Sequence, residues 1–356
     1  MVSYDKPFLN LQSQVHHLTS KGLDCGPADE AMKALHDVGY YRLTAYTYPM
    51  RRLLLPGEHR DTDHQFRADE YVDGAQLSDG MALAGFDAKL RGFAFDGLTH
   101  LELALRFQLA HTLGRRSPRA HVTRDDLDEQ AAAKPAPQRH REKYSDMYEY
   151  WCATYDSLVS RAGGEDFIRH FDAKYSDDDL PVWIAVEVFD FGALTRLYGL
   201  LKRSDQNEIS RRFGVTDGRQ LHGWLQGLNL IRNHAAHHNR LWNRNLTHRL
   251  AVIPPGVLLR PELLAHLGSV RDRDKVYPHL AVLAYALGTY DSSLNWHRTL
   301  RTQLRKFPSS ELLDQMQGMG MTSGWDDEDL WSREPAPAAA LPTPTNLKPL
   351  KPKRVA

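Results

Sequence analysis

The chain has 356 residues, of which 42% are hydrophobic and 10% aromatic, and its 45 Lys and Arg residues balance 45 Asp and Glu residues. This composition supports a large apolar core, and the balanced charge argues neither for nor against binding of nucleic acid. No stretch approaches the roughly 20 apolar residues that cross a bilayer, and the N-terminus, MVSYDKPFLN, lacks the apolar run of a signal peptide. The two cysteines, Cys25 and Cys152, show no metal or redox spacing. We therefore expect a cytoplasmic protein with no membrane partner.

Residues 1–75 are predicted to form an N-terminal helical segment that packs on the core. Two short amphipathic patterns, LQSQVHHLTSKG and PADEAMKALHDVG, predict two helices there. The aromatic run YYRLTAYTYPMRR follows them. Its tyrosines and arginines could stack nucleobases, or the tyrosines could pack a helix onto the core with their hydroxyls at the surface, and both interpretations stay open at this point.

Residues 76–332 are predicted to form the core of an all-α protein, because helical periodicity recurs along them and strand alternation is almost absent. The core helices are expected at 83–109, 178–201, 221–231 and 279–304. Acids and Pro181 suit the first turn of the second of these helices, and Gly192 is a candidate break in it. A short hairpin is expected near LAVIPPGV, and few or no other strands.

Two segments lack this periodicity. Residues 117–146 are polar and predict an exposed loop. Residues 333–356 are rich in proline and poor in core-forming residues, so we expect a disordered tail there.

The distribution of charge is more informative than the total. Nine Lys and Arg residues face three acids between Lys202 and Arg249, and five histidines lie in the same window. Such a stretch is either a solvated helix surface or a contact for nucleic acid, and charge alone does not decide between them.

The most unusual part of this window is IRNHAAHHNRLWNR, residues 231–244. At about 100° per residue, Asn233 and His237 share one face of a helix, whereas Arg232 falls on the apolar stripe of the same helix. A guanidinium on an apolar stripe needs a carboxylate or a phosphate, so Arg232 belongs either to an ion pair, with Glu102 as a candidate, or to a site. On an unbroken helix His237 would lie almost opposite Arg232. Either the helix bends there or two copies of the chain combine.

Metal binding is the main competing explanation for the histidines. His234 and His238 have the i, i+4 spacing that can hold zinc, but no HExxH glutamate lies between them and no cysteine or acid is close in sequence. We expect no metal and no cofactor. Histidine can move a proton near neutral pH, and arginine can stabilise charge on a phosphoryl oxygen. This pairing suits RNA, whose 2′-OH supplies its own nucleophile.

The motif Arg232-Asn233-x-x-x-His237 resembles the R-x4-6-H signature of the HEPN superfamily. The longer string LNLIRNHAAHHNRLWNR is similar to the Abi-like abortive infection family, the AbiD/AbiF group. Further segments resemble that family in the right order and together span about residues 5–330; they are KPFLNLQSQVHHLTSKGL, LHDVGYYRLTAYTYPMR, FDAKLRGFAFDGLTHLELALR, LPVWIAVEVFDFGALTRLYGLL and VYPHLAVLAYALGTYDSSLNWHRTLRTQL. The chain departs from the family pattern at THLELALR in the central helix and at His234.

The resemblance implies a bacterial anti-phage or toxin-type protein, a helical bundle with a HEPN-like core that cuts RNA without a metal, generally as a homodimer. Some similar proteins are controlled by a small noncoding RNA antitoxin. By this resemblance Arg232 and His237 are the catalytic pair, Asn233 is a positioning group and His238 is a second candidate for proton transfer. Weaker candidates for RNA binding or support are Glu102, Arg106, Arg240, Asn243 and Arg244.

Two other classes of function fit the same residues. A noncatalytic RNA-binding or regulatory defence module would use the same basic helix and bind RNA without cutting it. A metal-dependent nuclease would use the histidines as ligands and lose activity on chelation.

Overall fold

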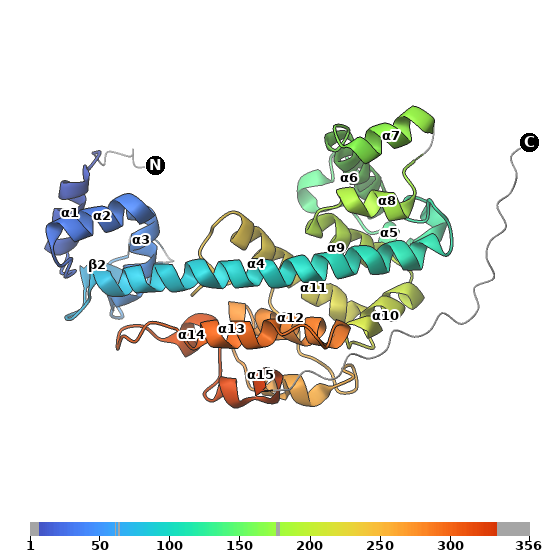
Figure 1. The fold of residues 1–356 in the computed structure, drawn as a ribbon. Coiled ribbons are helices and arrows are strands. Elements are labelled where there is room, and N and C mark those ends of the chain that lie inside the picture. The colour runs from blue at the N-terminus through green and yellow to red at the C-terminus, as the bar shows by residue number, and fades with distance from the viewer. Residues whose placement is uncertain (1–6, 61, 63–64, 176–178, 333–356) are drawn as a thin grey trace, which may run out of the picture.

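The computed structural model describes residues 7–332 except 61, 63–64 and 176–178, and this part of the chain is a helical bundle with one small sheet (Figure 1). The prediction of an all-α protein is confirmed. The α-helices are α1 (Leu11–Ser20), α2 (Ala28–Val38), α3 (Tyr40–Thr47), α4 (Leu77–Gly114), α5 (Glu129–Ala132), α6 (Met147–Arg161), α7 (Asp166–Lys174), α8 (Val182–Ala185), α9 (Phe191–Leu200), α10 (Arg203–Arg212), α11 (Gly218–Ala236), α12 (Val276–Tyr290), α13 (Trp296–Leu304), α14 (Gln315–Met319) and α15 (Asp329–Ser332). The 3-10 helices are η1 (Tyr48–Met50), η2 (Arg124–Asp126), η3 (Gln138–His140), η4 (Val186–Val188), η5 (Pro261–Gly268) and η6 (Trp325–Asp327).

Helix α4 is the axis of the molecule. Its 38 residues run through the structure as one continuous helix, with α3 packed near its start and α11, α12 and α13 packed along it (Figure 1). The leucine and phenylalanine stripe that predicted a helix over 83–109 is buried, including Leu90, Leu101 and Leu105 at 0% exposure. Because neighbours cover it on several sides, α4 carries buried side chains around much of its circumference rather than along one narrow stripe.

The predicted second and fourth core helices are each two pieces. The second ends at η4, before Gly192, and resumes as α9 because the side chain of Asp190 accepts a hydrogen bond from the backbone N–H of Ala193 and caps the new helix. The fourth breaks after α12, where the side chain of Asp291 accepts a hydrogen bond from the backbone N–H of Ser293, and resumes as α13. In both places an aspartate side chain accepts a backbone N–H in the segment that separates the two pieces.

The hairpin expected near LAVIPPGV is wrong. Residues 250–257 are irregular, because Pro254 and Pro255 lack the backbone donors of a ladder, and the nearby pairing of Val215 with Leu258 is a single bridge. The one described sheet instead pairs β1 (Arg51–Leu53) with β2 (Arg67–Tyr71) in antiparallel register.

The segment 117–146, which the sequence predicts as an exposed loop, is irregular and has many exposed residues, but it also carries buried side chains. It contains η2, α5 and η3, and its apolar side chains fill gaps beside α6 and α9. Its buried residues are Ala120, His121, Leu127, Ala132 and Ala136. The polar residues between them hid this packing in the sequence.

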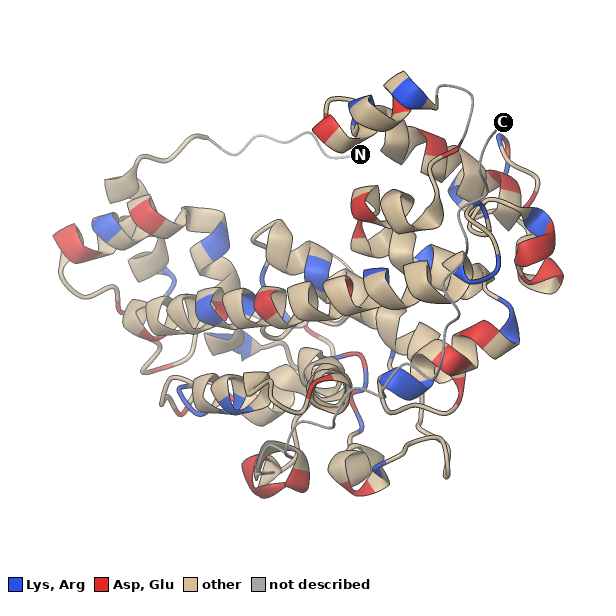
Figure 2. Cartoon of the chain, turned by 45° about the vertical axis from the view of Figure 1, so that its right-hand side comes forward, with Lys and Arg blue, Asp and Glu red and all other residues tan. Residues whose placement is uncertain are grey.

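The N-terminal helices contact α4 through α3. Tyr46 is buried at 1% exposure, in agreement with the packing interpretation of the tyrosine run, whereas Tyr41 is 79% exposed. The predicted tail, residues 333–356, lies outside the described residues. No helix in the described part of the chain is both long and apolar enough to span a membrane. Figure 2 shows acidic and basic positions interspersed over most helices, as the equal totals require.

Candidate functional site

The motif lies at the end of α11. The side chain of Asp217 accepts a hydrogen bond from the backbone N–H of Arg219 and starts the helix, and the stripe from Leu221 to Ile231 is buried against α4, α9 and α12. Helix α11 therefore reaches the motif as a fixed core element.

Helix α11 ends at Ala236. His237 is its C-terminal cap, and His238 adopts a left-handed backbone with φ of 56°. The backbone N–H of Asn239 donates back to the carbonyl of His234 at 2.8 Å, which satisfies a carbonyl at the helix end. Helix α11 thus ends at the motif, where the sequence left open whether the helix bends or two copies of the chain combine, and His237 and His238 are both exposed.

Arg232 points toward α4, as its place on the apolar stripe predicted. Its Nε lies 3.9 Å from Oε2 of Glu102, and its guanidinium carbon lies 5.9 Å from the centre of the Phe95 ring. Nε is buried and has no hydrogen-bond acceptor within reach in the described structure. The side chain as a whole is 28% exposed. Arg232 is therefore held at the surface of α4 by Glu102 with part of its guanidinium open to solvent.

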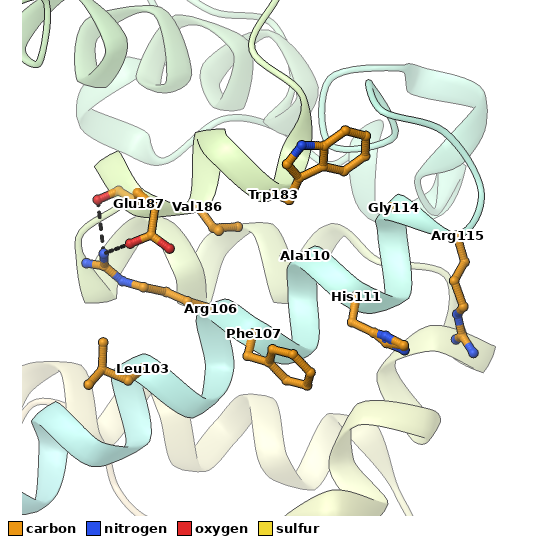
Figure 3. Close-up of a pocket in the computed structure, with 10 residues that line it drawn as sticks. All are labelled: Leu103, Arg106, Phe107, Ala110, His111, Gly114, Arg115, Trp183, Val186 and Glu187. Carbon is orange, nitrogen blue, oxygen red and sulfur yellow. Dashed lines mark hydrogen bonds and ion pairs between the residues drawn. The ribbon is translucent and has the colours of Figure 1, made fainter. Parts of the chain in front are cut away.

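Glu102 also binds Arg106. Oε1 of Glu102 accepts a hydrogen bond from Nη2 of Arg106 at 2.7 Å, so one carboxylate is shared between two arginines. Arg106 in turn donates to the carbonyl of Glu187 at 2.9 Å (Figure 3) and to that of Phe189 at 2.8 Å, both in the segment that leads into α9. Glu102 and Arg106 thus join α4, α11 and the start of α9 at one point.

An apolar groove opens beside Arg106, between α4 and the α8–η4 segment (Figure 3). Its volume is about 520 Å³, and large apolar side chains stand exposed along it, with Phe107 at 60% and Trp183 at 50%. The lining residues are Leu103, Arg106, Phe107, Ala110, His111, Gly114, Arg115, Trp183, Val186 and Glu187. The groove is continuous with the Glu102–Arg106 pair because it shares Arg106.

The residues after the motif are fastened to distant parts of the chain. Nη1 of Arg240 donates to the carbonyl of Ala45 at 2.6 Å, and Nε of Arg244 donates to the carbonyl of Arg240 at 2.7 Å. Asn243 has a left-handed backbone, and its Oδ1 accepts a hydrogen bond from Nζ of Lys275 at 2.9 Å. Burial lowers the pKa of Arg240. The structure thus shows each of these three expected supporting residues in an intramolecular contact.

Sequence reasoning missed Asp87, which anchors this segment. Its fully buried carboxylate accepts hydrogen bonds from the backbone N–H groups of Leu241 at 3.2 Å and Trp242 at 2.7 Å. It also accepts a hydrogen bond from the hydroxyl of Tyr46 and pairs with Arg91 one turn along α4. The available signal was an acid and an arginine four residues apart on the buried stripe of a predicted core helix.

The three histidines of the motif have different environments. His234 is half-buried in the last turn of α11, and its pKa is lowered by burial first and then by the positive charges of Arg244 and His237. His237 and His238 lie beyond the helix and are exposed. Because the helix ends between them, His234 and His238 do not share the helical face that an i, i+4 zinc pair uses. Within the described residues, no three His, Cys, Asp or Glu side chains form a group that could hold a metal ion.

The searches of curated proteins and of solved structures found no match. A protein-family model described as Abi-like protein matches residues 33–243, which is more than half of the 356-residue chain and includes α4, α9 and α11 with the whole motif. The chain therefore belongs to the Abi-like protein family.

Proposed function

We propose that this Abi-like protein acts in abortive infection as an RNA endonuclease that uses acid/base chemistry and no metal. The observation that supports this most directly is the arrangement at the end of α11, where Arg232 is fixed by Glu102 and His237 stands exposed just beyond the helix. An exposed imidazole can take the proton of a ribose 2′-OH or deliver one to the departing 5′-oxygen, and a guanidinium can stabilise the charge that develops on the phosphoryl oxygens. Membership of the chain in the HEPN superfamily is part of this proposal.

Each residue of the motif has a role in this proposal. His237 is the proton-transfer group and His238, which is also exposed, is the second candidate. Arg232 stabilises charge, and Asn233, one turn from His237 on α11, positions the RNA. Glu102 is a positioning residue, because it holds Arg232 by an ion pair and is itself oriented by Arg106.

A second copy of the chain would complete the site. Phe95, Leu103 and Phe107 stand 42–60% exposed at multiples of four residues, so they share one face of α4, and that face adjoins Arg232. An exposed apolar face of this kind is typical of a protein interface. We propose that a homodimer forms there and brings two motifs together.

The test is cleavage of mixed cellular RNA by the purified protein with and without EDTA. We expect cleavage that EDTA does not change, and we expect His237→Ala to lose about 10²- to 10⁴-fold in rate, because a positioned acid or base contributes about that much. Alanine keeps the helix end intact, so folding and RNA binding should survive. In a bacterial host, His237→Ala should also abolish protection against phage.

His234→Ala is the matched control, since His234 is half-buried and outside the Arg232–His237 signature. Equal loss from His234→Ala and His237→Ala would mean that the site is assigned wrongly. RNA binding without cleavage would favour the noncatalytic module, and loss of cleavage on chelation would favour a metal-dependent nuclease. Leu103→Asp should give a monomer that cleaves poorly; a monomer that stays fully active at nanomolar concentration would rule out the dimer.

A further inference from the structure

A cluster of aromatic and cationic side chains lies where η3, α6 and α9 meet. The rings of His140 and Tyr150 are stacked, with centroids 4.8 Å apart and planes 23° apart. Tyr144 lies 5.7 Å from Tyr150, and the guanidinium carbon of Arg196 lies 4.7 Å from the centre of the Tyr150 ring. All four side chains are partly exposed. We call these four residues the stacking cluster.

The turn that carries His140 is basic. Residues 134–144, KPAPQRHREKY, contain four Lys or Arg residues and one acid, Glu142. The side chains of Lys134, Arg139 and Lys143 are exposed, and in the described structure no carboxylate lies within ion-pair distance of them or of Arg196. This is unusual for the surrounding surface, where the nearby arginines are ion-paired, namely Arg115, Arg116, Arg119, Arg124 and Arg203.

The stacking cluster is close to the proposed catalytic motif. Helices α9 and α11 pack antiparallel, because Gly192 lies against Asn229 and Gly199 lies against the ring of His222. Arg196 stands between these two glycines on α9, so at 1.5 Å per residue it is level with a part of α11 about 12 Å before Asn233. The distance is short enough for one RNA strand to reach both places.

We propose that the stacking cluster is a platform for bases of single-stranded RNA, with Lys134, Arg139 and Lys143 contacting the phosphates beside it. Every base has a face that can stack on an aromatic ring, and unpaired cations attract the backbone, so aromatic rings interleaved with free cations fit a single strand. The Tyr150 ring stacks on His140 and lies against the guanidinium of Arg196, so the three side chains form layers. An RNA base would stack on the outer ring, which is His140. This deepens the proposed function and rests on it.

The charge arm of the test uses the full-length His237→Ala protein, so that RNA stays intact, and a fluorescein-labelled single-stranded RNA of mixed sequence. In fluorescence anisotropy, Arg139→Glu with Lys143→Glu should weaken binding about tenfold or more and reduce the slope of log K against log salt by about 1.4, which is about 0.7 for each lost phosphate contact. The matched control, Lys89→Glu with Lys306→Glu, makes the same charge change at exposed residues of α4 and the end of α13. It should bind nearly as well as the parent.

The stacking arm uses Tyr150. Tyr150→Phe keeps the ring and should bind RNA as the parent does, whereas Tyr150→Leu removes it and should weaken binding about tenfold, within the range for one base on one aromatic ring. Circular dichroism checks that each variant is folded.

Three results would overturn the platform. The first is that the parent does not bind RNA, and the second is that the control pair loses as much RNA affinity as the Arg139 and Lys143 pair. The third is that Tyr150→Leu binds RNA as the parent does and that polyglutamate displaces the labelled RNA as effectively as unlabelled RNA does. The last result would assign the surface to an acidic protein. If the platform substitutions, made in the protein with His237 intact, leave the rate of RNA cleavage unchanged, the platform is overturned and the proposed nuclease still stands.

Discussion

Asp87 shows how one buried side chain fixes the geometry after the motif. A buried carboxylate is costly unless it is paired and hydrogen-bonded, and Asp87 at 0% exposure has donors from two distant segments. It pairs with Arg91 on its own helix at 2.5 Å. The backbone that follows His237 is therefore held against α4 by the buried carboxylate of Asp87, which water does not reach.

Replacing this charge should cost much of the stability. Asp87→Asn leaves Arg91 without its partner, and we expect the free energy of unfolding in urea to fall by about 3–5 kcal/mol. The pKa of Tyr46, raised to about 12 by burial first and then by the Asp87 charge, should also fall, which absorbance titration measures.

Asp96→Asn is the control, because Asp96 is exposed on the same helix and the substitution is identical. It should change the free energy of unfolding by no more than about 0.5 kcal/mol. A loss as large as that of Asp87→Asn would contradict the role given to the buried carboxylate.

The sequence predicted some residue contacts and not others. The ion pair of Arg232 with Glu102 was one of two alternatives that the sequence left open, because a charge on an apolar stripe needs a partner and Glu102 lies at the edge of another stripe. The contact of Arg240 with the carbonyl of Ala45 was not, because a backbone acceptor almost two hundred positions away leaves no signal in local spacing. Arg240 was therefore expected at an RNA-binding surface.

At the scale of elements, glycine permits the close packing of α11 on α12. A Cβ added at Gly227 would lie 2.4 Å from Cδ2 of His279 and 3.1 Å from Cδ2 of His248. Buried rings cannot move away easily in a packed core. Gly227 is thus required by the approach of two helices and not by a turn.

Two glycines of α11 give a matched pair of substitutions. Gly227→Ala should lower the free energy of unfolding by about 1–3 kcal/mol through overpacking against His279. A Cβ added at Gly223 has no atom within 4 Å, so Gly223→Ala should raise the free energy of unfolding by about 0.5–1 kcal/mol, because alanine is the better helix former. Urea unfolding measures both, and effects of the same sign would refute the packing argument.

Element types were easier to predict than element ends. Stripes of leucine and phenylalanine predicted α4 and α11 because burial on one face needs helical spacing. The end of α11 at His237 was not predicted, since the left-handed residue that follows is His238 rather than the glycine usual there. Tertiary bonds such as those to Asp87 hold the chain in that conformation.

At the scale of the whole molecule, folding buries histidines in their neutral form. Burial is the main reason that the pKa is lowered to about 4 in His121, His222, His266 and His279. Their ordinary value is 6.5, so between about pH 6.5 and pH 4 the unfolded chain binds more protons than the folded protein. The stabilisation is complete above about pH 6.5 and is lost as the pH falls toward 4.

The free energy of unfolding should therefore decrease steadily as the pH is lowered from about 7 to about 5. His279→Leu removes one of these histidines and should make the decrease shallower, by up to one proton in the slope. His16→Leu, on the exposed face of α1, should leave the slope as it is. Urea unfolding across this pH range measures all three proteins, and a stability that does not depend on pH would contradict the assignment.

Two of the contacts that fasten the segment after the motif come from a residue made much later in synthesis. The backbone N–H of Asn243 donates to the carbonyl of Gly318, and Gly318 packs against the ring of Trp242. Asp87 and Ala45, which hold the same segment, precede the motif in the chain, so their contacts can form first and those of Gly318 last. For the proposed nuclease, this order delays the complete set of contacts until the chain is nearly finished. Limited proteolysis of arrested chains should show that full protection of this segment is reached only after Gly318 has left the exit tunnel.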